Sequence, residues 1–100
     1  MNIQVRWDEN RRLRNIGKHG LDFVDAARLL DRPYRLDVER ASGGEWWTQS
    51  FAYVFDVLAV LTCVHDPDGH AMQVISYRPA SREEWEAYHD WLENDFHDPH

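Results

Sequence analysis

The chain has 100 residues, of which 43% are hydrophobic and 29% are charged, as in one ordinary globular domain. This composition excludes an intrinsically disordered chain, which needs few apolar residues and a large excess of charge. A single cysteine excludes an intramolecular disulfide framework and any metal site built from several cysteines. Because Cys63 lies in an apolar run, it is predicted to be a small buried residue.

Charge is distributed unevenly along the chain, whose formal net charge is −7. Residues 1–40 hold nine Lys and Arg against seven Asp and Glu, whereas residues 41–100 hold two against eleven. Phosphate contacts supply most of the non-specific affinity for nucleic acid, so an acidic chain binds it poorly as a whole. A polyanionic partner is therefore expected to contact the N-terminal half.

No segment is predicted to span a membrane. The most apolar stretch, from Phe51 to Val64, is interrupted by Asp56 and is shorter than the roughly 20 residues that a spanning helix needs. The N-terminus lacks the apolar core of a signal peptide. These features predict a cytoplasmic protein.

The N-terminal residues predict a strand followed by a helix. Apolar and polar side chains alternate over residues 3–7, as in a short strand. Asp8 is a suitable N-cap for a helix from about Glu9 to His19, and Gly20 is a suitable left-handed C-cap. The outer surface of this helix is expected to carry its basic residues, which are Arg11, Arg12, Arg14 and Lys18.

A second helix and a strand are predicted next. Asp22 caps the helix and Pro33 stops it. One face is expected to hold the apolar residues at helical spacing, namely Phe23, Ala26, Ala27 and Leu30. Residues 35–39 alternate again as in a half-buried strand, and residues 41–44 predict a loop.

The region from Trp46 to Tyr77 predicts a series of antiparallel strands. Residues 57–64 are apolar at both alternating positions, as expected of a central strand. The turn signal of residues 66–69 joins this strand to a return strand over about residues 70–77. The turn before residue 57 is marked only by Asp56, which leaves the strand register there open.

The last predicted element is a helix that begins with a capping box. The Ser81 hydroxyl and the Glu84 carboxylate can each satisfy a free backbone N–H. One helix face is apolar, with Trp85, Tyr88, Trp91 and Leu92, and the other is acidic. One domain is expected over residues 1–95, with a flexible tail over residues 96–100. The order of elements predicts a small α+β domain, with the helices packed on one face of an antiparallel sheet.

Two segments together resemble one protein family. The first segment contains Trp7-Asp8-Glu9-Asn10, Asn15, Lys18-His19-Gly20, Phe23 and Ala26-Ala27. The second contains Ile75-Ser76, Arg78, Ala80, Glu84 and Tyr88. In this combination and order the chain resembles the BrnT family.

The resemblance implies a bacterial toxin of a type II toxin–antitoxin module, with a RelE-like fold and with RNA-cleaving activity that uses no cofactor. It further implies a BrnA-like antitoxin with a ribbon-helix-helix domain, so that operator DNA is contacted only through the antitoxin. The chain departs from the family pattern at three places. Only Arg82 follows the Arg78 motif as a basic residue, residues 55–57 replace a turn that contains glycine, and Tyr77 replaces a small residue.

RNA cleavage without a metal needs a base for the 2′-hydroxyl, an acid for the leaving oxygen and cations for the developing charge. The predicted catalytic residues are Lys18, His19, Arg78 and Glu84. Tyr88, one helical turn beyond Glu84, is a candidate border of the same cleft. Contacts to the RNA backbone are predicted at Arg11, Arg12, Arg14 and Arg82. The central prediction is that the Lys18-His19 end of the first helix and Arg78 together form a cationic pocket.

Each of these residues has a structural alternative. Lys18 and His19 occupy the last turn of a helix, where cations interact favourably with the helix dipole. Glu84 is explained by the capping box, Tyr88 by core packing and Arg78 by an ion pair at the surface. The basic residues of the first helix are explained as a solvated face.

Two further groups of residues allow two readings each. His65 and His70 flank the turn that contains Asp66 and Asp68, where a metal site is conceivable but a structural role is more common. Trp46, Trp47, Trp85 and Trp91 either fill the core or form an antitoxin interface.

Two functions follow as hypotheses. The first is a metal-independent endoribonuclease toxin that cleaves mRNA. The second is a toxin-fold protein with weakened catalysis whose main role is to bind an antitoxin or another protein. The acidic second half favours the second hypothesis, because it attracts a basic protein segment and repels RNA.

Overall fold

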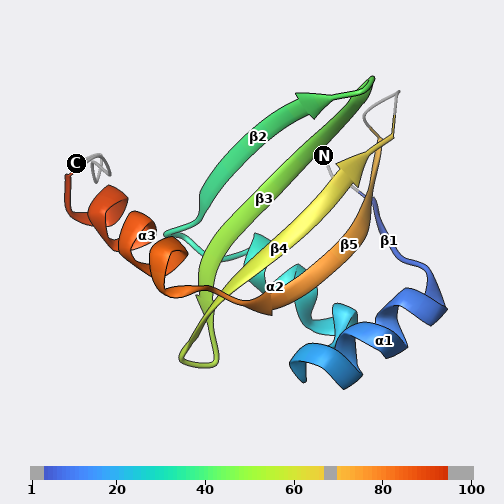
Figure 1. Ribbon diagram of the computed structural model, residues 1–100, viewed down its shortest axis with the longest axis horizontal. Coiled ribbons are helices and arrows are strands. Elements are labelled where there is room, and N and C mark those ends of the chain that lie inside the picture. Colours follow the sequence, from blue (N-terminus) through green and yellow to red (C-terminus); the bar gives the residue numbers. More distant parts are fainter. Residues whose placement is uncertain (1–3, 67–69, 95–100) are drawn as a thin grey trace.

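A five-stranded sheet forms the centre of the structure, a computed structural model that describes residues 4–66 and 70–94 (Figure 1). The strands lie in the order β1-β5-β4-β3-β2. Their bounds are β1 Gln4–Arg6, β2 Leu36–Ser42, β3 Glu45–Val54, β4 Val57–His65 and β5 Ala71–Pro79. The helices are α1 Glu9–His19, the 3-10 helix η1 Phe23–Asp25, α2 Ala26–Leu30 and α3 Arg82–Asn94. This is the predicted α+β class.

The sheet is antiparallel except for β1, which pairs with β5 in parallel over Gln4–Arg6. Parallel neighbours need a long connection between them, and here it consists of α1, η1, α2 and three strands. The sheet is thus mostly antiparallel, as predicted, and the pairing of β1 with β5 is the parallel exception.

The β2–β3 and β3–β4 hairpins each turn through two residues with positive φ, as type I′ turns require. Gly43 and Gly44 connect β2 to β3, so Ala41 belongs to β2 rather than to the predicted loop. Phe55 and Asp56 connect β3 to β4 at φ values of 50° and 67°, which settles the register that the sequence left open. This conformation costs a residue with a Cβ atom about 1–2 kcal/mol, so glycine is the usual residue there. Residues 55 and 56 are not glycine, and the turn is therefore poorly marked in the sequence.

The caps of α1 follow the prediction, but the second helix does not. The Asp8 carboxylate accepts a hydrogen bond from the Arg11 N–H, and Gly20 ends α1 at a φ of 73°. Asp22 does cap the next segment, which begins as η1 before it becomes α2. The buried positions fall three residues apart, at Phe23, Ala26 and Leu29. The first interval spans the 3-10 turn, and the second is the ordinary i, i+3 spacing of one α-helix face. Ala27 is exposed, contrary to the prediction.

The sheet is covered on both faces, each with its own hydrophobic cluster. η1 and α2 pack on one face, where Phe23 and Leu29 contact the apolar side chains of β3, β4 and β5. α3 packs on the other face through Tyr88, which contacts Phe51 and Val60. The prediction that all helices share one face was wrong, because β4 is apolar on both of its sides and needs cover on both. In Figure 1, α1 and α3 lie at opposite sides of the sheet.

Two predicted features lie outside the described residues. They are residues 67–69 of the predicted β4–β5 turn and the predicted tail at residues 96–100. Cys63 is 2% exposed, as predicted. None of the helices within residues 4–66 and 70–94 has the length and apolar character that a membrane crossing requires.

Candidate functional site

A bulge in β5 decides which way Arg78 points. Thr62 pairs with Ser76 and Cys63 pairs with Val74, so Ile75 is an extra residue on β5. The extra residue lets Val74 and Tyr77 both enter the core under η1 and α2. Arg78 pairs with Val60 and therefore emerges on the opposite face, where α3 begins.

Arg78 meets Glu84 there in a two-pronged ion pair. Its Nη1 and Nη2 donate to the two carboxylate oxygens of Glu84 at 2.7 and 2.8 Å. Glu84 also completes the predicted capping box: it accepts from the Ser81 N–H at 2.8 Å, and its own N–H donates to Ser81 Oγ at 3.2 Å. The side chains of Arg78 and Glu84 remain 28% and 23% exposed, so the pair lies at the surface.

The ion pair determines the protonation of both partners. Hydrogen bonds from Arg78 lower the pKa of Glu84 to about 2, and the same bonds raise the pKa of Arg78. Glu84 is therefore a carboxylate throughout the physiological pH range. A carboxylate with so low a pKa is a poor general acid or base at neutral pH, so its contribution is to hold the guanidinium in one orientation.

Asn15 of α1 places the end of that helix beside Arg78. Its side-chain amide donates to the Tyr77 carbonyl at 2.7 Å and accepts from the Tyr77 N–H at 3.2 Å. β1 pairs only with Ala71–Gln73, so the following part of β5 has β4 on one side and no strand on the other. The Asn15 amide takes the place of a strand on that open side. A third bond, to the Leu21 carbonyl at 2.9 Å, fixes the chain just after α1.

His19, in the last turn of α1, lies within electrostatic reach of Arg78. Burial lowers the pKa of His19, and the positive charges of Lys18 and Arg78 lower it further. The shift favours the neutral imidazole, which is the form that can accept a proton. Lys18 is exposed at the same helix end. The charges of Lys18 and Arg78 thus both act on His19, and Glu84 is the anion that pairs with Arg78. That Lys18, His19 and Arg78 form one cationic pocket stays a prediction.

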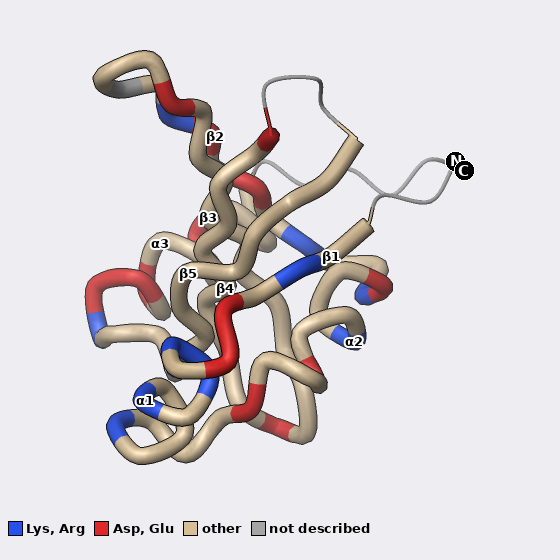
Figure 2. Tube along the Cα trace, turned by 90° about the vertical axis from the view of Figure 1, so that its right-hand side faces the viewer, with Lys and Arg blue, Asp and Glu red and all other residues tan. Residues whose placement is uncertain are grey.

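The four arginines predicted to contact RNA are in different situations. Arg12 is bound by Glu9 at 2.6 Å and by Asp22 at 3.0 Å, which raises its pKa. Arg82 is 87% exposed and pairs with Glu86 at 3.2 Å. Within the described residues, Arg11 and Arg14 form no ion pair. Figure 2 shows these basic positions along α1 and mostly acidic positions at the start of α3.

Glu84 and Tyr88 do border one pocket, of about 260 Å³, between α3 and strands β2 and β3. Tyr88 is 2% exposed and its hydroxyl donates to the Tyr34 carbonyl at 2.6 Å, so it is also a core residue. The pocket shares Val38, Arg40 and Gln49 with a second one of about 220 Å³ that reaches Trp47. Together they form a groove across the α3 face, which we call the α3-face groove.

Arg40 and Trp47 in this groove were missed as candidate functional residues. They are direct cross-strand partners on β2 and β3, and the Trp47 Nε1–H is buried without a hydrogen-bond partner in the described structure. A buried donor left unpaired is costly unless a ligand satisfies it. A two-residue turn at Gly43 and Gly44 was the signal that would have placed the pair together.

The remaining sequence candidates have structural partners. His65 Nε2 lies 2.6 Å from Thr48 Oγ1, and its ring stacks on Trp46. No group of three or more potential metal ligands occurs among the described residues, which do not include Asp68. Trp85 stacks near His89 and Trp91 packs on Tyr88.

Three helices on a mostly antiparallel five-stranded sheet are consistent with the RelE-like class of fold. A family model described as ribonuclease toxin, BrnT, of type II toxin–antitoxin system matches residues 7–84, which include α1, Arg78 and Glu84. The chain belongs to this BrnT family of ribonuclease toxins, and a toxin of such a system has a cognate antitoxin as its partner. No curated protein matched the chain.

Proposed function

We propose that the protein is a metal-independent endoribonuclease that cleaves mRNA by attack of the 2′-hydroxyl on the adjacent phosphorus. The observation that carries the proposal is the position of a neutral His19 within electrostatic reach of an oriented Arg78. His19 can accept a proton, and Arg78 can bind a phosphate.

In the proposed reaction His19 takes the proton of the 2′-hydroxyl. The 2′-oxygen forms a bond to phosphorus, and the bond between phosphorus and the 5′-oxygen breaks. Arg78 stabilises the charge on the phosphate oxygens with the N–H groups that Glu84 leaves unused. Lys18, the remaining proton donor of the set, protonates the leaving 5′-oxygen. The products are a 2′,3′-cyclic phosphate and a 5′-hydroxyl.

The α3-face groove supports a path for the substrate from Glu84 toward Trp47. Arg40 offers a cation to a phosphate, and Trp47 offers an unpaired N–H and an aromatic ring to a base. Arg11 and Arg14 offer further cations on α1. The protein is proposed to act on mRNA in the cytoplasm, and a BrnA-like antitoxin with a ribbon-helix-helix domain to neutralise it and to carry it to operator DNA.

One observation favours the alternative, a toxin-fold protein with weakened catalysis that mainly binds its antitoxin. Glu84 occupies both prongs of Arg78, and Arg12 is held by two carboxylates, so two of the candidate cations are already paired. Cations that are paired within the protein attract phosphate less strongly.

Incubation of the purified protein with RNA in EDTA separates the two functions. The nuclease proposal predicts fragments that end in a cyclic phosphate, and loss of cleavage in the Arg78→Ala and His19→Ala variants. Arg32→Ala, which removes an exposed cation far from the site in sequence, is the matched control and retains cleavage. The alternative predicts that the wild-type protein leaves RNA intact at a protein concentration that is sufficient to saturate the antitoxin in a separate binding measurement.

A further inference from the structure

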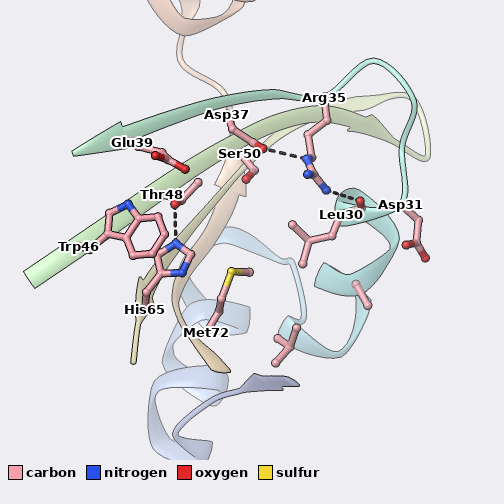
Figure 3. A pocket seen from close by; sticks show the side chains of 12 residues that line it. Leu30, Asp31, Arg35, Asp37, Glu39, Trp46, Thr48, Ser50, His65 and Met72 are labelled. Carbon is pink, nitrogen blue, oxygen red and sulfur yellow. Dashed lines mark hydrogen bonds and ion pairs between the residues drawn. The ribbon is translucent and has the colours of Figure 1, made fainter. Parts of the chain in front are cut away.

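A separate pocket of about 530 Å³ opens on the face of the sheet that carries α2 (Figure 3). Its walls come from the end of α2, the segment that leads into β2, and the inward-facing residues of β2 and β3. None of its lining residues borders the α3-face groove, because alternate residues of β2 and β3 point to opposite faces. We call it the α2-face pocket.

The α2-face pocket is acidic. Its charged lining residues are Asp31, Asp37 and Glu39, together with one cation, Arg35. Arg35 is already bound, by Asp37 Oδ1 at 3.1 Å and by the Leu30 carbonyl. Asp31 and Glu39 are exposed and form no ion pair within the described residues. Two negative charges in the pocket therefore lack a counter-charge.

Trp46 gives the pocket an ordered aromatic wall. One face of its indole stacks on His65, with ring centroids 3.9 Å apart and an interplanar angle of 16°. His65 is itself held by Thr48 Oγ1 at 2.6 Å, so the stacked rings are fixed in place. Trp46 nevertheless remains 44% exposed, which leaves indole surface for another group. The face of a tryptophan ring attracts cations, and guanidinium groups stack on it.

An unpaired hydroxyl at the pocket independently points to a missing ligand. Ser50 is 3% exposed and lines the cavity, as Figure 3 shows beside Asp37. Within the described residues its Oγ forms no hydrogen bond, although Thr48, the neighbouring hydroxyl on the same face of β3, has one to His65. A buried polar group is usually satisfied, so a ligand that donates hydrogen bonds is the natural partner of Ser50.

We propose that the α2-face pocket binds a basic segment of a protein partner through Arg or Lys side chains. The inference rests on the proposed function in one respect: the partner that such a toxin offers is its antitoxin. One basic side chain donates to Glu39 and Ser50 with its cationic group on Trp46, and a second basic side chain of the same segment pairs with Asp31, which lies at the opposite end of the pocket (Figure 3). The same two uncompensated carboxylates repel the phosphates of RNA, which excludes the pocket from the substrate path.

The test uses a fluorescein-labelled peptide of alternating arginine and alanine, nine residues long, with a glutamate and alanine peptide as the negative probe. Fluorescence polarisation at low salt gives the Kd of the whole protein. Glu39→Gln and Asp31→Asn are each expected to weaken arginine-peptide binding about fivefold, as for an exposed charge pair. Glu93→Gln, which removes an exposed carboxylate of α3, is the matched control and leaves the Kd unchanged.

A second readout places the peptide in the pocket. The indole N–H resonance of Trp46, assigned with the Trp46→Phe variant, is expected to shift on titration of the arginine peptide, while that of Trp85 does not. Equal Kd values for the wild type and both pocket variants, no binding by the wild type, or an unmoved Trp46 resonance would overturn the proposal.

The same proteins distinguish this proposal from the nuclease proposal. Glu39→Gln and Asp31→Asn are expected to cleave RNA at the wild-type rate, because neither residue borders the α3-face groove. Absence of RNA cleavage by the wild type would count against the nuclease alone, whereas the peptide titration reads the pocket without any RNA present.

Discussion

Asn15 and Tyr77 are joined by a pair of hydrogen bonds in which a side-chain amide replaces a neighbouring strand. Asn15 and Tyr77 are 6% and 2% exposed, so both hydrogen bonds are buried. Asn15→Ala is expected to destabilise the protein by about 2–4 kcal/mol, since two buried backbone groups lose their partner. Urea unfolding measures this loss. The exposed Asn10 of the same helix provides the control, and Asn10→Ala stays close to the wild type.

The same bonds position the end of α1, so Asn15 variants also report on the site. At temperatures where Asn15→Ala is still folded, its RNA cleavage is expected to fall although Asn15 touches no substrate. If folded Asn15→Ala protein cleaves RNA at the full rate, the position of the α1 end does not matter for the reaction.

The Arg78–Glu84 pair makes stability depend on pH. Glu84 has a folded pKa of about 2 against an ordinary value of 4.5, so its contribution is present above pH 4.5 and is lost as the pH falls toward 2. Glu84→Gln is expected to cost about 1 kcal/mol at pH 7, because the pair is partly exposed. Chemical unfolding at several pH values measures the difference between wild type and variant. A difference that persists at pH 2 would contradict the assignment.

His19 is expected to titrate below its ordinary value of 6.5. An NMR titration of its ring protons measures the pKa directly. In Arg78→Gln the pKa is expected to rise, though not to 6.5, because burial is the larger cause and Lys18 remains. Arg32→Gln serves as the comparison and leaves the titration where it is in the wild type. An unchanged His19 pKa in Arg78→Gln would show that the two side chains do not interact.

Cys63 is expected to resist thiol reagents in the folded protein. Burial, with a smaller contribution from Asp37, raises the pKa of this thiol to about 12. The thiolate is the reactive form, so almost none is present at pH 8. Ellman's reagent is expected to react with one thiol only after the protein is unfolded in guanidinium chloride. Rapid reaction of the native protein would indicate that β4 opens to solvent.

Local signals in the sequence predicted the ends of the elements well. Asp8 and Gly20 cap α1, and Ser81 with Glu84 forms the capping box, because each motif acts within a few residues of itself. The doubly apolar pattern of residues 57–64 likewise predicted the central strand. These features need no knowledge of the rest of the chain.

Long-range features were not predictable in the same way. The parallel pairing of β1, the bulge at Ile75 and the bonds of Asn15 to Tyr77 all depend on which segments meet in space. The turn at Phe55 and Asp56 adopts positive φ values without glycine, so its residue types do not mark it as a turn. For the candidate site, the sequence proposes Arg78 and His19 as functional residues. Arg40 and Trp47 become candidates only because strand pairing places them side by side in one groove.

The central claim is that His19 and Arg78 act in one step on one phosphate. Initial cleavage rates of a single oligoribonucleotide in EDTA, for the wild type, His19→Ala, Arg78→Ala and the double variant, test it most directly. Residues that act as a unit lose their effect together, so the double variant is expected to be no slower than the slower single variant. Losses that multiply in the double variant would place the two residues in independent roles and contradict the account.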